Sequence, residues 1–191
     1  MLDYRVNDLS PLSTVFSEEV MQGYKRVFNF LWRLKRIDHL LSQSWRQNQD
    51  HRAKWERLKG RQDVFHQFNL QHHEMAHFVS NIHNYIMVEV VESQWKIFSD
   101  EVRQAQDLDQ LIECQRKFVS SVLDKALLSE KNQEFYKTLQ KVLNEVYMFT
   151  VKKSTYFYSG ALKEYERVMR LESAQAQGID VSQMDEEDLV P

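Results

Sequence analysis

The feature that most constrains this chain is the helical periodicity of residues 17–47, which contain no proline and a single glycine, Gly23. Ser17 is a suitable N-cap, and Glu18 and Glu19 follow where a helix dipole favours acids. One set of apolar residues then recurs at helical spacing: Val20, Tyr24, Val27, Leu31, Leu34, Leu41 and Trp45. A second set lies to one side: Phe30, Ile37 and Leu40. Two sets predict a helix that is wedged between neighbours or offers one side to a partner.

The rest of the chain also favours helix, because 191 residues include only four glycines and two prolines. Asp63, Asp107 and Ser129 are candidate N-caps for later helices. Further helices are expected at residues 63–92, 93–102, 107–126 and from 129 through 169. Short connections favour antiparallel neighbours. The predicted fold class is therefore all-α, a bundle of about five helices.

Several segments depart from this pattern. Residues 2–6 alternate apolar and polar side chains, which is typical of a short strand. Residues 48–62 are polar and basic, and we predict a loop there with one helical turn. Residues 173–191 are small, polar and acidic, which predicts a disordered tail. The expected organisation is a helical domain over residues 1–172, incomplete at both ends, followed by that tail.

The expected core includes Leu31 of the first helix and Phe78 of the second. The second helix should turn one set of side chains inward: Phe68, Met75, Phe78, Ile82 and Tyr85.

Charge and cysteine content exclude several classes. The net charge is −3, with +6 in residues 17–62 and −9 in the remainder. A sequence pI near 6.2 argues against a dedicated nucleic-acid binder, so we expect no nucleic-acid partner. The single cysteine, Cys114, allows no internal disulfide and fits a reducing compartment such as the cytoplasm. No run approaches the ~20 apolar residues needed to cross a bilayer, so no membrane insertion is expected.

Residues His73-Glu74-Met75-Ala76-His77 spell H-E-x-x-H, in which two histidines bind zinc and the glutamate activates water. A zinc metallohydrolase is therefore one alternative function. His83 lies six residues after His77, about 240° around a straight helix, so it faces away. The glycine that turns the longer motif is replaced by Ser80. We therefore predict no catalytic residue, no metal ligand, no cofactor and no enzymatic activity.

Two blocks carry a resemblance: YKRVFNFLWRLKRIDHLL and HFVSNIHNYIMVEVVESQWKIFSDEVRQAQDLDQLI. In this order and spacing they resemble the C-terminal domain of the gamma-tubulin complex component family, and within it component three. Where the family often has a histidine, this chain has Gln115. The family's N-terminal domain and last long helix are absent, so we expect either a fragment or an incomplete gene product.

The resemblance implies a structural subunit that binds gamma-tubulin, together with other gamma-tubulin complex components. It would position gamma-tubulin as a template for microtubule nucleation. The implied location is the cytoplasm and cytoskeleton, at a microtubule organizing center or spindle pole. A generic helical scaffold for another partner is a further alternative.

The candidate partner-binding residues lie beside the second apolar set of the first helix: Arg26, Phe30, Arg33 and Arg36. Fixed positive charge beside an apolar side chain suits an acidic partner such as a tubulin, with Phe30 as the anchor. Alternatively, another helix of the same chain covers this face, and the arginines lie at its rim.

Overall fold

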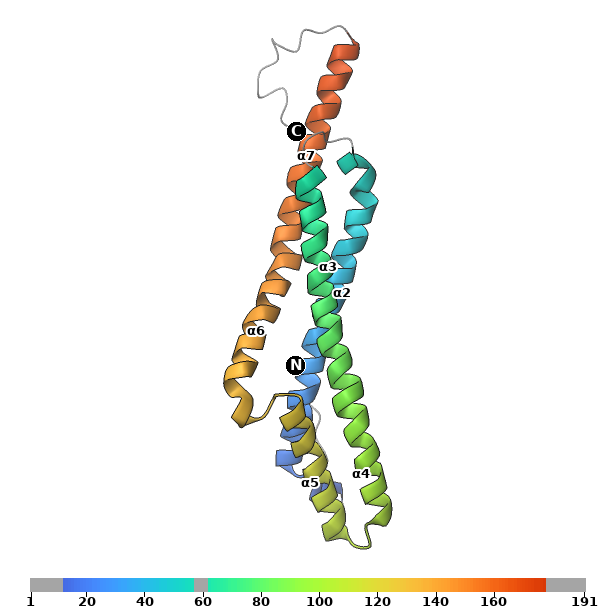
Figure 1. Ribbon diagram of the computed structural model, residues 1–191, viewed down its shortest axis with the longest axis vertical. Helices are drawn as coiled ribbons and strands as arrows, with labels where there is room; N and C mark the ends of the chain where they lie inside the picture. The colour runs from blue at the N-terminus through green and yellow to red at the C-terminus, as the bar shows by residue number, and fades with distance from the viewer. Residues whose placement is uncertain (1–11, 57–61, 178–191) are drawn as a thin grey trace. The chain divides into compact units, whose positions relative to one another are not determined.

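A computed structural model describes residues 12–56 and 62–177, and these residues form a succession of helices (Figure 1). The helices are α1 (Leu12–Val15), α2 (Glu18–Glu56), α3 (Gln62–Asn84), η1 (Tyr85–Glu92), α4 (Ser93–Gln104), α5 (Leu108–Lys125), η2 (Glu130–Asn132), α6 (Gln133–Met148), η3 (Phe149–Lys153) and α7 (Ser154–Ala176). Of these, η1 and η3 are π-helical and η2 is a 3₁₀ turn. The predicted all-α fold with about five helices is confirmed for the described residues.

One predicted boundary was wrong, and another marks a change of helix type rather than a break. The helix predicted to end at 47 continues as α2 to Glu56, because residues 48–56 contain no glycine or proline and several strong helix formers. α4 begins at Ser93 as predicted, but α3, η1 and α4 follow one another without a break. The π-helical turns of η1 shift the spacing of the apolar residues along the helix. In the sequence, this shift resembles the start of a separate helix.

Other predictions fall partly or wholly outside the described residues. The predicted strand at 2–6 and residues 178–191 of the predicted tail lie outside them. Residues 173–176 belong to α7, so the tail was predicted to start too early.

The predicted caps of α2 and α5 are confirmed. The Val20 amide donates to Ser17 Oγ at 3.4 Å, and the Gln110 amide donates to Asp107 Oδ1 at 2.7 Å. The Gln110 side chain in turn accepts from the amide of Gln106 at 3.0 Å. Ser129 precedes η2 as expected, but its hydroxyl accepts from the Asn132 side chain rather than capping a backbone amide.

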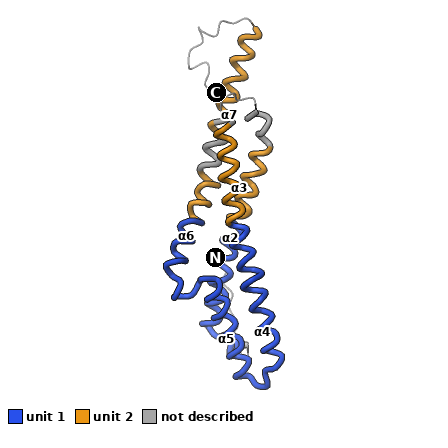
Figure 2. The backbone as a smooth tube through the Cα atoms, viewed as in Figure 1, with its two compact units in different colours: residues 1–36, 79–143 blue, residues 37–78, 144–191 orange. Residues whose placement is uncertain are grey.

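The described helices fall into two compact units (Figure 2). Unit 1 comprises residues 1–36 and 79–143, and unit 2 comprises residues 37–78 and 144–191. Each unit is thus assembled from stretches far apart in the sequence, and α2 contributes to both.

The core of unit 1 joins α2 to η1, α5 and α6. Its buried apolar side chains are Val20, Phe30, Leu34, Val79, Ile86, Val90, Phe118, Val119, Val122, Ala126, Leu128 and Leu143. Gly23 lies in this interface, where an added Cβ would stand 2.3 Å from Val119 Cγ1. Glycine therefore allows α2 and α5 to approach closely at this point.

The core of unit 2 includes polar side chains as well as apolar ones. Its buried residues are Ile37, Leu41, Phe68, Val146, Phe149 and Ala174, with Ser44, Asn48, His72 and Thr150. The Phe68 and Phe149 rings stack with centroids 5.0 Å apart. The Asn48 side chain donates to Asn69 Oδ1.

The inward face of α3 differs from the predicted one by about one residue. Phe78 and Tyr85 are exposed, whereas Val79 and Ile86 are buried, so the prediction of a core Phe78 was wrong. The physical reason is that His72 occupies a core position, and a polar residue hides the true apolar spacing. Leu31, the other predicted core residue, is half-buried.

Candidate partner-binding surfaces

The four predicted partner-binding residues lie on α2 within unit 1, and three of them contact other parts of that unit. Phe30 is only 2% exposed and meets the Tyr136 ring of α6 edge-on, with centroids 5.8 Å apart. The Arg26 guanidinium donates to the Leu128 carbonyl, and the Arg33 guanidinium donates to the Gln140 carbonyl at 3.3 Å. Arg36 is exposed.

The end of α5 positions the carbonyl that Arg26 contacts. Leu127 adopts a left-handed conformation with φ of 60°. The Leu128 amide then donates back to Leu123, and the Leu127 amide to Asp124, which is the Schellman pattern of helix termination. This turn directs the chain from α5 toward η2.

These contacts fit the alternative in which another helix of the same chain covers the Phe30 face. Both arginines lie at the rim. Arg26 donates to a backbone carbonyl in the turn after α5, and Arg33 donates to a backbone carbonyl of α6. A partner would have to displace Tyr136 to reach Phe30. A partner surface at Arg26, Phe30, Arg33 and Arg36 stays a prediction.

Two aromatic residues that sequence reasoning left out lie on the outward face of α2. The Phe28 and Trp32 rings are stacked with centroids 6.1 Å apart, and their residues are 43% and 60% exposed. The sequence already indicated that they lie elsewhere, because Trp32 is about 200° around the helix from Phe30 and so is on nearly the opposite side of α2. Neither residue fits the two apolar sets, and their i,i+4 spacing places them side by side.

The H-E-x-x-H residues lie on the exposed side of α3. His73, Glu74 and His77 are all exposed, and the two imidazole rings are 6.5 Å apart between centroids. Within the described parts of the chain, no three His, Cys, Asp or Glu residues are grouped so as to hold a metal ion. Among the residues that the structure describes, the motif is therefore two histidines on a helix surface with no third zinc ligand grouped beside them.

His72, next to this motif, has a different environment inside unit 2. Its Nε2 lies 2.9 Å from the Leu41 carbonyl, and its ring is 5.5 Å from that of Trp45. Because a carbonyl only accepts, Nε2 carries the proton and donates. Burial lowers the pKa of His72, while the hydrogen bond to Leu41 partly opposes this change.

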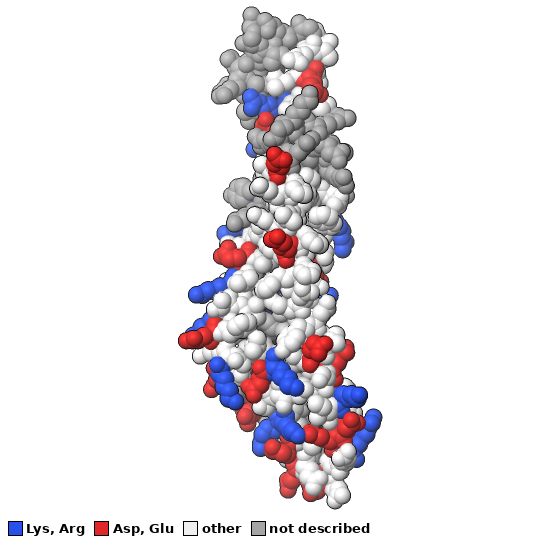
Figure 3. Space-filling view, in the orientation of Figure 1, with Lys and Arg blue, Asp and Glu red and all other residues white. Residues whose placement is uncertain are grey.

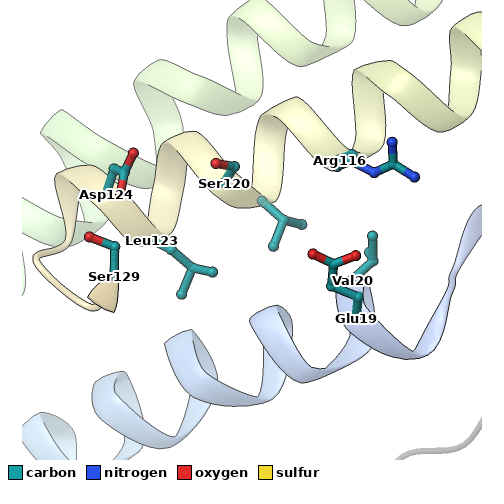
Figure 4. Close-up of a pocket in the computed structure, with 8 residues that line it drawn as sticks. Glu19, Val20, Arg116, Ser120, Leu123, Asp124 and Ser129 are labelled. Carbon is teal, nitrogen blue, oxygen red and sulfur yellow. The ribbon is translucent and has the colours of Figure 1, made fainter. Parts of the chain in front are cut away.

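A shallow groove in unit 1 runs between the start of α2 and α5 (Figure 4). It is lined by Glu19, Val20, Arg116, Val119, Ser120, Leu123, Asp124 and Ser129. Its apolar floor and mixed rim, with one arginine and two carboxylates, select no single class of ligand.

On the face shown in Figure 3, Lys and Arg are interspersed with Asp and Glu over unit 1, as expected for a solvated protein surface.

Comparison with known proteins identifies the family. The family model described as the C-terminal region of gamma-tubulin complex components matches residues 1–187. The chain belongs to the gamma-tubulin complex component family. The predicted resemblance is thus confirmed, and the match extends beyond the two sequence blocks on which it was based.

Several relatives agree with this membership. The chain is 33% identical to gamma-tubulin complex component 3 homolog of Xenopus laevis over 174 residues, which is 90% of this chain and 18% of the relative. It is 31% identical to the human component 3 over 176 residues, covering 92% of this chain and 19% of the relative. The spindle pole body component alp6 of Schizosaccharomyces pombe is 33% identical over 158 residues, covering 78% and 18%. The chain therefore spans about a fifth of the length of these relatives.

Gln115 has a structural role in unit 1. Gln115 is buried, and its side-chain amide donates to the Tyr24 hydroxyl at 2.7 Å. Burial raises the pKa of Tyr24, while this hydrogen bond lowers it. The residue thus joins α5 to α2 inside unit 1.

No helix among the described residues has both the length and the apolar character needed to span a membrane.

Proposed function

We propose that this chain is the gamma-tubulin-binding part of a structural subunit of a gamma-tubulin complex. In this role it positions gamma-tubulin as a template for microtubule nucleation, beside other gamma-tubulin complex components. The observation that carries the proposal is the family match over residues 1–187. The names of the relatives, which include spindle pole body components, support a location at a microtubule organizing center or spindle pole.

The mechanism we infer is mechanical rather than chemical. Packed helices present a bound subunit at a fixed height and angle, and the chain supplies no catalytic group. The polar and charged contacts of unit 1, such as Arg33 on the Gln140 carbonyl, support rigidity, because each ties a side chain to a neighbouring helix.

The test is a pull-down of purified gamma-tubulin by the full chain, with alpha/beta-tubulin as the specificity control. We expect retention of gamma-tubulin well above the control. Equal retention of both tubulins, or of neither, would contradict the proposal.

The Phe30 face is tested in the same assay with Arg33→Glu. Loss of binding at an unchanged melting temperature would assign this face to the interface. A lower melting temperature with a proportionate loss of binding would assign it to the core of unit 1.

A further inference from the structure

The buried sides of α2 and α3 in unit 2 follow the spacing of a coiled coil. On α2 the buried positions advance by four, three and four residues: Ile37, Leu41, Ser44 and Asn48. On α3 the buried and half-buried positions advance by three, four and three: Phe65, Phe68, His72 and Met75. The Leu41 carbonyl accepts from His72. Further along α2, Asn48 contacts Asn69, which comes earlier in α3, so the two helices are antiparallel (Figure 1).

Apolar packing alone does not fix how far α3 lies along α2. Leu41 follows the buried Leu34 by seven residues, so either leucine would fit the same place. Met75 likewise follows Phe68 by seven. A shift of one heptad would therefore put apolar side chains against apolar side chains again, with α3 displaced by about 10 Å along α2. In an antiparallel pair the turn then moves along the chain by only about half a heptad, so such a shift requires few residues to change conformation.

Two asparagines distinguish the observed pairing from its shifted alternatives. Asn48 is only 2% exposed, and its side-chain amide donates to Asn69 Oδ1. A shift of one heptad in one direction would place Asn48 opposite Ala76. The opposite shift would place Asn69 opposite Leu41. Each shift would leave an amide without its partner against an apolar side chain, which is costly.

The same contact is a poor source of stability. Asn48 Oδ1 is buried and has no hydrogen-bond partner in the part of the chain that the structure describes. A pair of leucines would fill the two positions without burying any polar side chain. The asparagine pair therefore contributes to the choice of pairing rather than to the strength of the packing.

We infer that the Asn48–Asn69 pair fixes the register of α2 against α3 in unit 2, at a cost in stability. The consequence for function rests on the proposed function. A platform that presents gamma-tubulin at a fixed height and angle needs a single register, because a shifted one displaces α3 by about 10 Å.

The test compares the full wild-type chain with Asn48→Leu/Asn69→Leu. Spin labels at Gln43→Cys and Gln67→Cys, both exposed positions, report the register by double electron–electron resonance in a Cys114→Ser background. In the observed pairing the labels lie about two turns apart along the helix axis, so a shift in either direction changes their distance. We expect one distance in wild type and a second, separate distance in the leucine variant. The urea midpoint of the leucine variant should equal or exceed that of wild type.

Gln49→Leu/Gln71→Leu is the matched control, because it replaces two exposed amides of the same helices. The control should keep a single distance. A single unchanged distance in the Asn48→Leu/Asn69→Leu variant would overturn the inference, as would a second distance in wild type or in the control. An unfolded or less stable leucine variant would overturn it too, because the asparagine pair would then be a source of stability. None of these measurements involves tubulin, so their failure is separate from that of the gamma-tubulin pull-down.

Discussion

At the scale of single residues, the fate of a side chain depends on which face of its helix meets a neighbour. Phe30 and Trp32 are both aromatic and are two positions apart on the same helix. Phe30 is buried, whereas Trp32 is exposed and stacks on Phe28. The difference is the presence of Tyr136 on one side of α2. Arginines at the rim then complete hydrogen bonds that water would otherwise make.

Phe30→Ala tests the burial of this residue. We expect a loss of about 3–5 kcal/mol in the free energy of unfolding, because the cavity beside Tyr136 cannot fully close. Urea denaturation followed by circular dichroism measures it. Phe28→Ala is the matched control on the outward face, and a similar loss in both variants would contradict the assigned faces.

A pH effect is expected from His72 in unit 2. Its pKa is lowered by burial, so the unfolded chain binds a proton more readily than the folded one. The stabilisation by the neutral ring is complete above the unfolded pKa of about 6.5 and is lost as the pH falls below it. Wild type should therefore lose more stability between about pH 7.5 and about pH 5.5 than His72→Gln does.

Urea midpoints at the two pH values measure this difference. Gln67→Ala, exposed on the same helix, is the control and should keep the wild-type dependence. An identical pH dependence in His72→Gln and wild type would remove His72 as the source.

At the scale of elements, the packing of α2 on α5 depends on one missing side chain. Gly23 is an unfavourable residue inside a helix, by about 1 kcal/mol relative to alanine. It is tolerated because Val119 of α5 occupies the space where a Cβ would stand. Nearby, the hydrogen bond from Gln115 to Tyr24 fixes the two helices in register.

Gly23→Ala should therefore be destabilising although alanine is the better helix former. We expect a net loss of about 1–3 kcal/mol as α5 is displaced. Gly160→Ala in α7 is the matched control, because nothing lies within 4 Å of its Cβ position. That variant should be neutral or more stable by up to about 1 kcal/mol, and thermal melts of both variants decide between the two effects.

At the scale of the whole molecule, two compact units are built from helices that pass from one unit to the other. Among the described residues, both cores are built mainly from helices, and neither unit draws on a disulfide, since the chain has one cysteine. The H-E-x-x-H residues lie on the surface of α3 rather than in either core. Stability should thus be independent of metal.

A chelator test follows from this arrangement. Treatment of the full chain with EDTA, or addition of zinc in equal amount, should leave the melting temperature unchanged. Elemental analysis of purified protein should find no stoichiometric zinc. A chelator-dependent fall in melting temperature, abolished by His73→Gln, would instead indicate a metal site.

The sequence by itself determined the helical class, the capped starts of α2 and α5, and the family. These follow from local signals: apolar spacing, a side-chain oxygen before a helix, few glycines and prolines, and two characteristic blocks. They need no knowledge of what packs against what.

Only the tertiary structure decided which sides of the helices face the cores. α2 has aromatic residues on several sides, so periodicity alone leaves its orientation open. The choice is made by groups more than a hundred positions away in sequence, such as the Leu128 and Gln140 carbonyls that accept from Arg26 and Arg33. Likewise His72 is a core residue because of the Leu41 carbonyl, a partner that no pattern within α3 reveals.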